Sequence, residues 1–149
     1  MQAKETKLQE LIEGTKQYIV PLFQREYTWN IKEWKILWDD ILELTKDENP
    51  KNHFIGSIVS MPTISVPEGV AKYMLIDGQQ RLTTIFVILI LLRNKSIEEE
   101  FSAEINELFI INKFKKWIDK YKLLPTQTNK DRDTYQKLVD NNNVDENIK

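Results

Sequence analysis

The sequence contains no cysteine and only one histidine among its 149 residues. The absence of cysteine excludes disulfide bonds, thiolate metal sites and a thiol nucleophile. The single histidine, His53, excludes a metal site built from several histidines of this chain. The longest purely apolar run, residues 85–92, has eight residues, far fewer than the roughly 18 that a membrane-spanning helix needs.

The chain also lacks an excess of charge of either sign. Lysine and arginine total 21 and aspartate and glutamate total 23, so the formal net charge is −2. This balance excludes a protein whose whole surface grips nucleic acid, and any such binding requires a local basic patch. Residues 2–7 are polar and do not resemble the apolar part of a signal peptide. We therefore expect a soluble, cytoplasmic protein.

What is present is a pattern of short apolar segments typical of an α+β protein. Gly14 and Asn30 stand where a helix C-terminal cap and a helix N-cap are expected, and Gly56 falls inside a predicted strand. The helix over 79–92 is apolar on all sides and is predicted to be buried. In chain order we expect a helix over 4–13, a strand over 17–21, a helix over 31–46, strands over 54–61 and 72–76 that form a hairpin, and the helix over 79–92.

Beyond residue 95 the pattern predicts further helices, over 97–121 and from 131 to about 142, with Pro125 ending the first. We expect a single domain over 1–149, in which 1–95 forms an α+β core carrying the site and 96–149 forms a helical extension. An apolar helix that begins near Tyr135 runs into a polar end. We therefore expect this chain to be the N-terminal fragment of a longer protein.

The most informative segment is D-G-Q-Q-R-L-T-T at residues 77–84, a strand end, a glycine and the first turn of a helix. Free N–H groups at a helix N-terminus attract anions, and Gly78 permits close approach of a phosphate. Arg81 can hold phosphate oxygens, Thr83 offers a hydroxyl, and Asp77 can position magnesium or a ribose hydroxyl. The alternative is an ordinary Asp-Gly turn in which Asp77 is an N-cap and Arg81 forms a surface salt bridge.

A second segment, residues 19–29, places Gln24 and Arg25 between a strand and several aromatic residues. Such a pair suits the wall of a binding pocket, and the alternative is that both side chains are solvated. For the aromatic side chains we expect packing into the core, because aromatic residues dominate protein cores. The aromatic residues concerned are Phe23, Tyr27 and Trp29.

Two further groups are weaker candidates. Gly56 and Ser57 suit close approach of a ligand and donation to a phosphate, whereas His53 is expected to be a loop or packing residue rather than a base. Asp39 and Asp40 are adjacent, and adjacent side chains on a helix diverge by about 100° and do not converge on one metal ion. We expect Asp39 to be solvated and leave the role of Asp40 open.

Four motifs in this order resemble a known family: V-P-L-F-Q-R-E-Y-T-W at 20–29, W-x3-W-D-D-I at 34–41, H-F-I-G-S-I-V at 53–59 and L-I-D-G-Q-Q-R-L-T-T at 75–84. Together they resemble the N-terminal domain of GmrSD-type, modification-dependent restriction endonucleases, over residues 5 to 140. The resemblance implies an α+β fold similar to the ParB/sulfiredoxin group, with a small mixed sheet flanked by helices. Sulfiredoxin chemistry itself is excluded, because it uses a cysteine.

The resemblance also implies that the domain binds a nucleoside triphosphate with Mg²⁺, and hydrolyses it, in an anti-phage defence system. DNA cleavage is implied to belong to an HNH nuclease domain, C-terminal or on a separate protein, because no histidine follows residue 53 in this chain. Asp77 and Gln80 are the candidate catalytic residues, and Asp77 is the candidate magnesium ligand. The nucleotide site is expected to contain Gln24, Arg25, Gly56, Ser57, Asp77, Gly78, Gln79, Gln80, Arg81 and Thr83.

Two functional hypotheses follow. The first is a nucleotide-binding sensor domain, with NTP hydrolysis an open question, whose phosphates are held by Arg81, Arg25 and the N–H groups after Gly78. The second is a non-enzymatic module that binds modified DNA or a partner protein through the aromatic loop 23–29. A lysine cluster could supply the local basic face that this second hypothesis needs. Its members are Lys113, Lys115, Lys116, Lys120 and Lys122.

Overall fold

The computed structural model describes residues 4–46, 56–63, 69–126 and 131–140. Within them the chain forms a four-stranded mixed sheet packed against helices, which confirms the predicted α+β class. His53, the first two residues of the strand predicted over 54–61 and most of its hairpin connection lie outside the described residues.

The sheet has the strand order β2-β3-β1-β4. The strands are β1 (Lys16–Ile19), β2 (Val59–Pro62), β3 (Ala71–Asp77) and β4 (Leu123–Leu124). The central strand β1 runs parallel to β3 and to β4, and β2 pairs with β3 in the antiparallel direction, as the predicted hairpin requires. Because β1 and β3 are parallel, the segments that follow them leave the sheet at the same edge. This edge brings the loop after β1 next to the D-G-Q-Q-R segment.

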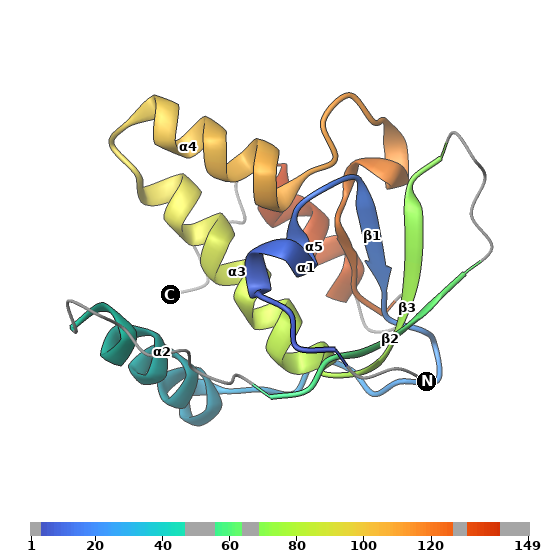
Figure 1. Ribbon diagram of the computed structural model, residues 1–149, viewed down its shortest axis with the longest axis horizontal. Coiled ribbons are helices and arrows are strands. Elements are labelled where there is room, and N and C mark those ends of the chain that lie inside the picture. Colours follow the sequence, from blue (N-terminus) through green and yellow to red (C-terminus); the bar gives the residue numbers. More distant parts are fainter. Residues whose placement is uncertain (1–3, 47–55, 64–68, 127–130, 141–149) are drawn as a thin grey trace.

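The helices gather beside the sheet, except for α2, which stands apart from it (Figure 1). In Figure 1, α3 crosses the molecule diagonally next to the sheet, with α4 packed above it. The helical segments are α1 (Leu8–Ile12), α2 (Ile31–Thr45), α3 (Gln79–Lys95), α4 (Glu99–Ile105), the π-helical turn η1 (Asn106–Ile110), the 3-10 turn η2 (Trp117–Lys120) and α5 (Asp131–Val139).

Local sequence signals explain where α1 and α2 end and begin. The Asn30 side chain accepts a hydrogen bond from the Lys32 N–H at 3.1 Å, and the Glu33 carboxylate accepts one from the Asn30 N–H at 2.9 Å. This reciprocal capping box confirms Asn30 as the N-cap of α2. Gly14 adopts a φ of +89° directly after α1, the left-handed conformation expected at a helix C-terminus.

Helix α3 is the centre of the hydrophobic core. Leu82, Phe86 and Ile90 recur every four residues on one face and are fully buried. The helix is not buried on every side, however, because Leu91 and Leu92 are exposed, which corrects the prediction. Among the described residues no helix is long and apolar enough to cross a membrane. The other buried core residues are Ile12, Tyr18, Val20, Leu37, Leu75, Ile85, Ile105, Ile110, Tyr121, Leu123, Leu124, Tyr135 and Val139.

The single helix predicted over 97–121 is wrong. The continuous helical stretch stops at Ile110, Ile111 is extended and forms a bridge with Tyr121, and the chain between them makes a loop that contains the 3-10 turn η2. The cause is tertiary: the buried Asn112 side chain binds the backbone of Lys16 and Asp119, so this segment packs against β1 and does not continue the helix. The chain after residue 95 also supplies strand β4, in the extension over 96–149 that was expected to be helical.

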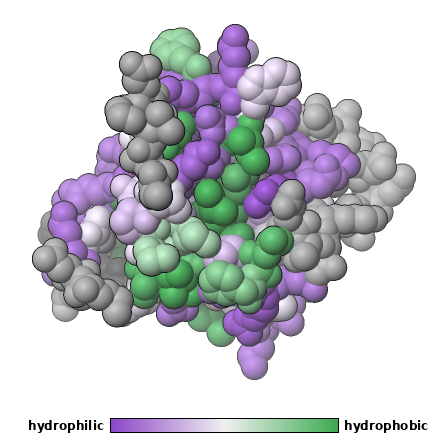
Figure 2. Space-filling view, turned by 90° about the vertical axis from the view of Figure 1, so that its right-hand side faces the viewer, coloured by the Kyte–Doolittle hydropathy of each residue, from purple (hydrophilic) through white to green (hydrophobic). Residues whose placement is uncertain are grey.

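Figure 2 shows the side of the molecule on which β2 and β3 lie in Figure 1, with apolar surface in the middle and hydrophilic surface around it. Met61 of β2 and Ile76 of β3 are exposed apolar side chains of these strands.

The strand predicted over 54–61 begins later than expected, because β2 starts at Val59. Gly56, Ser57 and Ile58 precede the strand, so Gly56 is a loop residue rather than a strand glycine.

Candidate functional site

The turn between β3 and α3 requires a glycine. Gly78 is the N-cap of α3 with a φ of +88°, and its N–H donates to the Asp77 carboxylate at 2.8 Å. A Cβ atom at this position would lie 3.0 Å from the Ser57 carbonyl oxygen and from the Ile58 side chain. Asp77 is therefore not the N-cap itself, and the segment 56–58 packs directly on the turn.

The N-terminal turn of α3 carries unpaired backbone N–H groups and the partial positive charge of the helix dipole. No side chain caps the helix and no acidic residue lies in its first turn. The first helical hydrogen bond runs from the Leu82 N–H to the Gly78 carbonyl at 2.9 Å. The backbone N–H groups of Gln79, Gln80 and Arg81 therefore have no partner within the helix. Such a helix end attracts anions through its N–H groups and its dipole.

Arg81 is held beside this helix end by the segment 56–58. Its Nη1 donates to the Ser57 carbonyl at 3.0 Å. Gly56 lies directly against the guanidinium, since a Cβ atom at Gly56 would fall 2.5 Å from Arg81 Cζ and 2.5 Å from Nη1. Arg81 thus binds a backbone carbonyl here rather than the carboxylate that a surface salt bridge requires.

Two glutamines attach the loop after β1 to the same edge. The Gln24 Nε2 donates to the Ile76 carbonyl at 3.1 Å, and the Gln79 Nε2 donates to the Arg25 carbonyl at 2.7 Å. The Arg25 backbone is therefore tied to the first residue of α3, while its side chain is exposed. This contact places the Arg25 backbone beside the N-terminus of α3.

Gln80 is the main clamp of this loop. Its Oε1 accepts from the N–H groups of Thr28 at 2.8 Å and Trp29 at 3.2 Å, and its Nε2 donates to the Glu26 carbonyl at 2.8 Å. The side chain is buried. In this arrangement the amide group positions residues 26–29, and its predicted catalytic role stays a prediction.

A chain of hydrogen bonds through two hydroxyl groups links Gln80 to the start of α2, and sequence reasoning did not find it. The Thr84 hydroxyl donates to the Gln80 carbonyl at 2.8 Å, and the Tyr27 hydroxyl lies 2.6 Å from it. The Trp34 indole N–H donates to the Tyr27 hydroxyl at 2.6 Å. Since the Thr84 proton is used, Tyr27 donates to Thr84, and each hydroxyl is both donor and acceptor. Tyr27 and Thr84 stand in the quoted motifs, but no spacing rule pairs them.

The aromatic residues of the loop divide into two groups. Tyr27 and Trp29 are half-buried, and Trp29 packs against the core, as expected. Phe23 was expected in the core and is 74% exposed, so that prediction is wrong. The reason is that Pro21 and the turn after it carry Leu22 and Phe23 away from the sheet before Gln24 returns the chain to β3.

The sequence profile of the family described as "GmrSD restriction endonuclease, N-terminal domain" matches residues 8–149. The chain belongs to this family. The match includes every residue of the site, from Gln24 to Arg81. No curated protein matches the chain.

In this GmrSD N-terminal domain, nine of the ten predicted nucleotide-site residues meet at one edge of the sheet. Thr83 stays a prediction: it lies about 200° around the helix from Arg81, but one turn after Gln79 on the same side of α3. Asp39 is exposed on α2 and Asp40 is half-buried there. Within the described ranges, no three histidine, aspartate or glutamate residues lie together in a way that could hold a metal ion. The residues that meet are Gln24, Arg25, Gly56, Ser57, Asp77, Gly78, Gln79, Gln80 and Arg81.

Proposed function

We propose that the N-terminal end of α3 binds the phosphate groups of a nucleoside triphosphate. The observation that carries this proposal is an uncapped helix N-terminus with the Arg81 guanidinium fixed beside it. Backbone N–H groups and an arginine together form a charge-assisted site for phosphate oxygens. The two glycines at positions 56 and 78 permit this close packing, because a Cβ atom at Gly56 would collide with the guanidinium and one at Gly78 would crowd Ser57 and Ile58.

The fixed position of Arg81 supports binding in a specific way. One N–H of its guanidinium is held by the Ser57 carbonyl, and the Gly56 backbone limits its position from one side. A side chain that is already ordered loses less conformational entropy when it binds. The remaining N–H groups are available to phosphate oxygens. Arg25, exposed on the loop that Gln79 anchors, supplies a second cation.

Magnesium would enter such a site together with the nucleotide. Asp77 is exposed, and one of its carboxylate oxygens accepts the Gly78 N–H. Mg²⁺ commonly binds through one or two carboxylates, phosphate oxygens and water, so a single aspartate next to a triphosphate fits its requirements. Bound there, the ion would neutralise phosphate charge, and Asp77 is the residue proposed to hold it.

For a domain of a restriction endonuclease, the proposed role of the nucleotide is control. We propose that nucleotide binding, and hydrolysis where it occurs, regulates DNA cleavage by a nuclease domain that the 149 residues do not contain. Asp77 is a candidate for two alternative roles, as the magnesium ligand or as the proton acceptor for the attacking water. Gln80 supports the reaction indirectly, because it positions the loop that carries Arg25.

The proposal is tested by calorimetry with GTP, UTP, CTP and ATP in the presence of magnesium. We expect one or more of them to bind, and Arg81→Ala to weaken binding by roughly 10- to 100-fold, the loss typical of a charge-assisted hydrogen bond. Lys95→Ala is the matched control, because it removes a cation from the opposite end of the same helix. Equal affinities of the wild-type protein and Arg81→Ala would refute the site.

The second candidate is a non-enzymatic module that binds modified DNA or a partner protein through the aromatic loop 23–29. One observation favours it: Leu22 and Phe23 are adjacent, large, apolar and exposed. Exposed pairs of this kind are common at protein interfaces. Under this hypothesis Phe23→Ala abolishes partner binding and leaves nucleotide affinity unchanged, so the same set of variants separates the two functions.

A further inference from the structure

A second surface lies at the other end of the sheet. The loop after Ile111 packs beside Lys16, at the start of β1, whereas the phosphate site follows the end of β3. Phe114 and Trp117 in this loop are each 88% exposed. Both adopt positive φ values, +66° and +59°, and they are the only residues other than glycine in the described ranges to do so.

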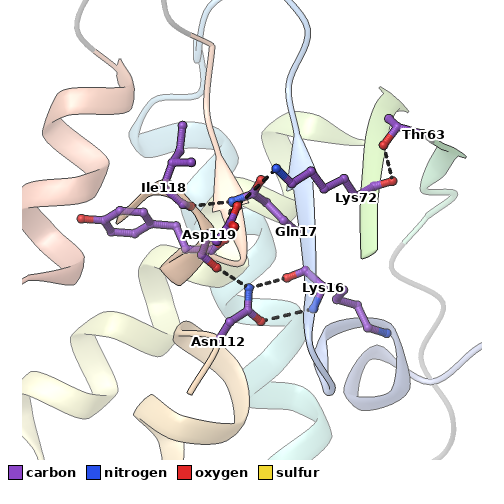
Figure 3. A network of polar contacts seen from close by, with 8 residues as sticks. Lys16, Gln17, Thr63, Lys72, Asn112, Ile118 and Asp119 are labelled. Carbon is purple, nitrogen blue, oxygen red and sulfur yellow. Dashed lines mark hydrogen bonds and ion pairs between the residues drawn. The ribbon is translucent and has the colours of Figure 1, made fainter. Parts of the chain in front are cut away.

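Positive φ is unfavourable for bulky side chains, and such residues persist only where the surrounding structure holds them. Here two buried side-chain amides, those of Asn112 and Gln17, hold the loop through hydrogen bonds to its backbone (Figure 3). The Asn112 side chain donates to the carbonyls of Lys16 and Asp119, at 3.0 and 2.9 Å. The Gln17 side chain donates to the carbonyls of Ile118 and Tyr121, at 2.7 and 2.9 Å. The two aromatic side chains are thus presented to solvent by a prearranged backbone.

The loop is also the most basic part of the described chain. Residues 113–120 read K-F-K-K-W-I-D-K, with four lysines and one aspartate, a formal charge of +3 in a chain of net charge −2. The carboxylates around it are engaged: Asp119 lies 3.2 Å from Lys72, and Glu107 lies 3.2 Å from Lys113. Asp140 likewise pairs with Lys120 at 2.7 Å. Among the described residues, no carboxylate forms an ion pair with Lys115 or Lys116.

A shallow hollow adjoins Trp117 and gives a planar group room to lie against the indole. Its volume is about 440 Å³, and it is lined by Trp117, Ile118, Lys120, Tyr121 and Gln136. Lys120 also lies over the Tyr121 ring, 4.9 Å from its centroid. Flat aromatic surfaces next to ammonium groups suit a ligand that carries both planar rings and negative charge.

We propose that this loop, residues 113–120, binds an unpaired nucleic-acid strand. Bases stack on Phe114 and Trp117, while Lys115 and Lys116 contact the phosphates between them. Base stacking on aromatic residues combined with a basic track is the usual means of holding single strands. An anionic membrane surface is the competing partner, but membrane-binding segments present a broad apolar face. Here two rings stand among four lysines.

The test measures fluorescence anisotropy of a labelled oligothymidylate of roughly 16 nucleotides, a length that spans a typical single-strand site. We expect Phe114→Gly and Trp117→Gly each to weaken binding by about 10-fold, the usual effect of losing one stacked base. Glycine relieves the positive φ, so both variants should melt at the same temperature as the wild-type protein or higher. Weaker binding by an equally stable protein separates a binding role from a structural one.

The lysines are tested through salt. The double variant Lys115→Gln/Lys116→Gln should reduce the slope of log affinity against log salt by about 1.4, roughly 0.7 for each lost phosphate contact with a single strand. Phe101→Ala, an exposed aromatic on α4, and Lys35→Gln on α2 are the matched controls and should bind like the wild-type protein.

Three outcomes would overturn the proposal. One is unchanged binding by the Phe114 and Trp117 variants, and another is binding of phosphatidylglycerol vesicles without binding of the oligonucleotide. The third is loss of oligonucleotide binding in Arg81→Ala, since that would place the strand at the other end of the sheet. Nucleotide binding by calorimetry is independent of all three, so this proposal and the phosphate site can fail separately.

Discussion

Replacement of Gly56 by alanine is the sharpest perturbation of the candidate site. The added Cβ atom would lie 2.5 Å from Arg81 Cζ and Nη1 and 2.7 Å from Nη2, closer than real contacts allow. The backbone at Gly56 also has a φ of +103°, which residues with a side chain avoid. Gly56→Ala therefore strains the loop and displaces the guanidinium.

The two effects differ in size. The backbone strain is expected to cost about 1–3 kcal/mol of unfolding free energy. The displacement adds about 1 kcal/mol, because the guanidinium is the mobile end of a long side chain and loses only its hydrogen bond to Ser57. Gly14→Ala is a matched control. Its φ is +89°, but its Cβ would meet nothing closer than Lys16 Cε at 3.6 Å, so it carries the strain alone.

The assay is a double-mutant cycle in urea. Gly56→Ala is compared in the wild-type background and in Arg81→Ala, where the guanidinium is absent. We expect a coupling energy of about 1 kcal/mol between Gly56 and Arg81 and, within error, none between Gly14 and Arg81. Calorimetry on the same proteins should show that Gly56→Ala loses nearly as much nucleotide affinity as Arg81→Ala, because the guanidinium is moved away from the helix end.

Two results would refute this reasoning. If Gly56→Ala is equally destabilising in both backgrounds, the contact between the glycine and the guanidinium has no energetic importance. If Gly56→Ala is destabilising but binds nucleotide like the wild-type protein, the position of Arg81 does not determine the phosphate site. Either result can be read even if the variant is unstable, since Gly14→Ala reports the cost of backbone strain.

Two further predictions concern stability. Gln80→Ala leaves the Thr28 and Trp29 N–H groups without their acceptor, so we expect a loss of about 2–4 kcal/mol in urea unfolding, and a change below about 1 kcal/mol would contradict the clamp. Burial, with a smaller effect of Lys16, lowers the pKa of Lys122 to about 8. The unfolded chain then binds more protons between pH 8 and 10, and stability should rise there by up to about 2 kcal/mol. Above pH 10 stability should fall, because burial raises the pKa of Tyr18 to about 12 and the unfolded tyrosine ionises first. Lys122→Met should abolish the rise, and a flat wild-type profile between pH 8 and 10 would contradict it.

Local sequence signals determined much of this protein. Asn30 with Glu33 specifies the start of α2, and Gly14 specifies the end of α1, because capping depends only on neighbouring residues. The apolar run after Gly78 indicates α3, because the length and composition of such a run are also local features of the sequence. The four ordered motifs were enough to indicate the family, which the profile match over residues 8–149 then confirmed.

Only the tertiary structure decided the residues between Ile97 and Tyr121. Their apolar residues are spaced well enough to predict one helix, but the chain leaves the helix after Ile110. Asn112 forms its hydrogen bonds with Lys16, about a hundred residues away in the sequence, and with the far end of its own loop. No local pattern encodes a partner at that distance, so Phe114 and Trp117 were assigned to a helix and are instead presented to solvent.

The candidate site shows the same division. The sequence by itself identified nine residues that the structure brings to one edge, because their types and their order suggest phosphate chemistry. It did not show that Gly56 lies against the Arg81 guanidinium. It also did not show that the Gln80 amide forms hydrogen bonds with the backbone of the loop 26–29. A side chain's type is read from the sequence, whereas its partners depend on which segments the fold places beside it, and here those segments leave β1 and β3 at a shared edge.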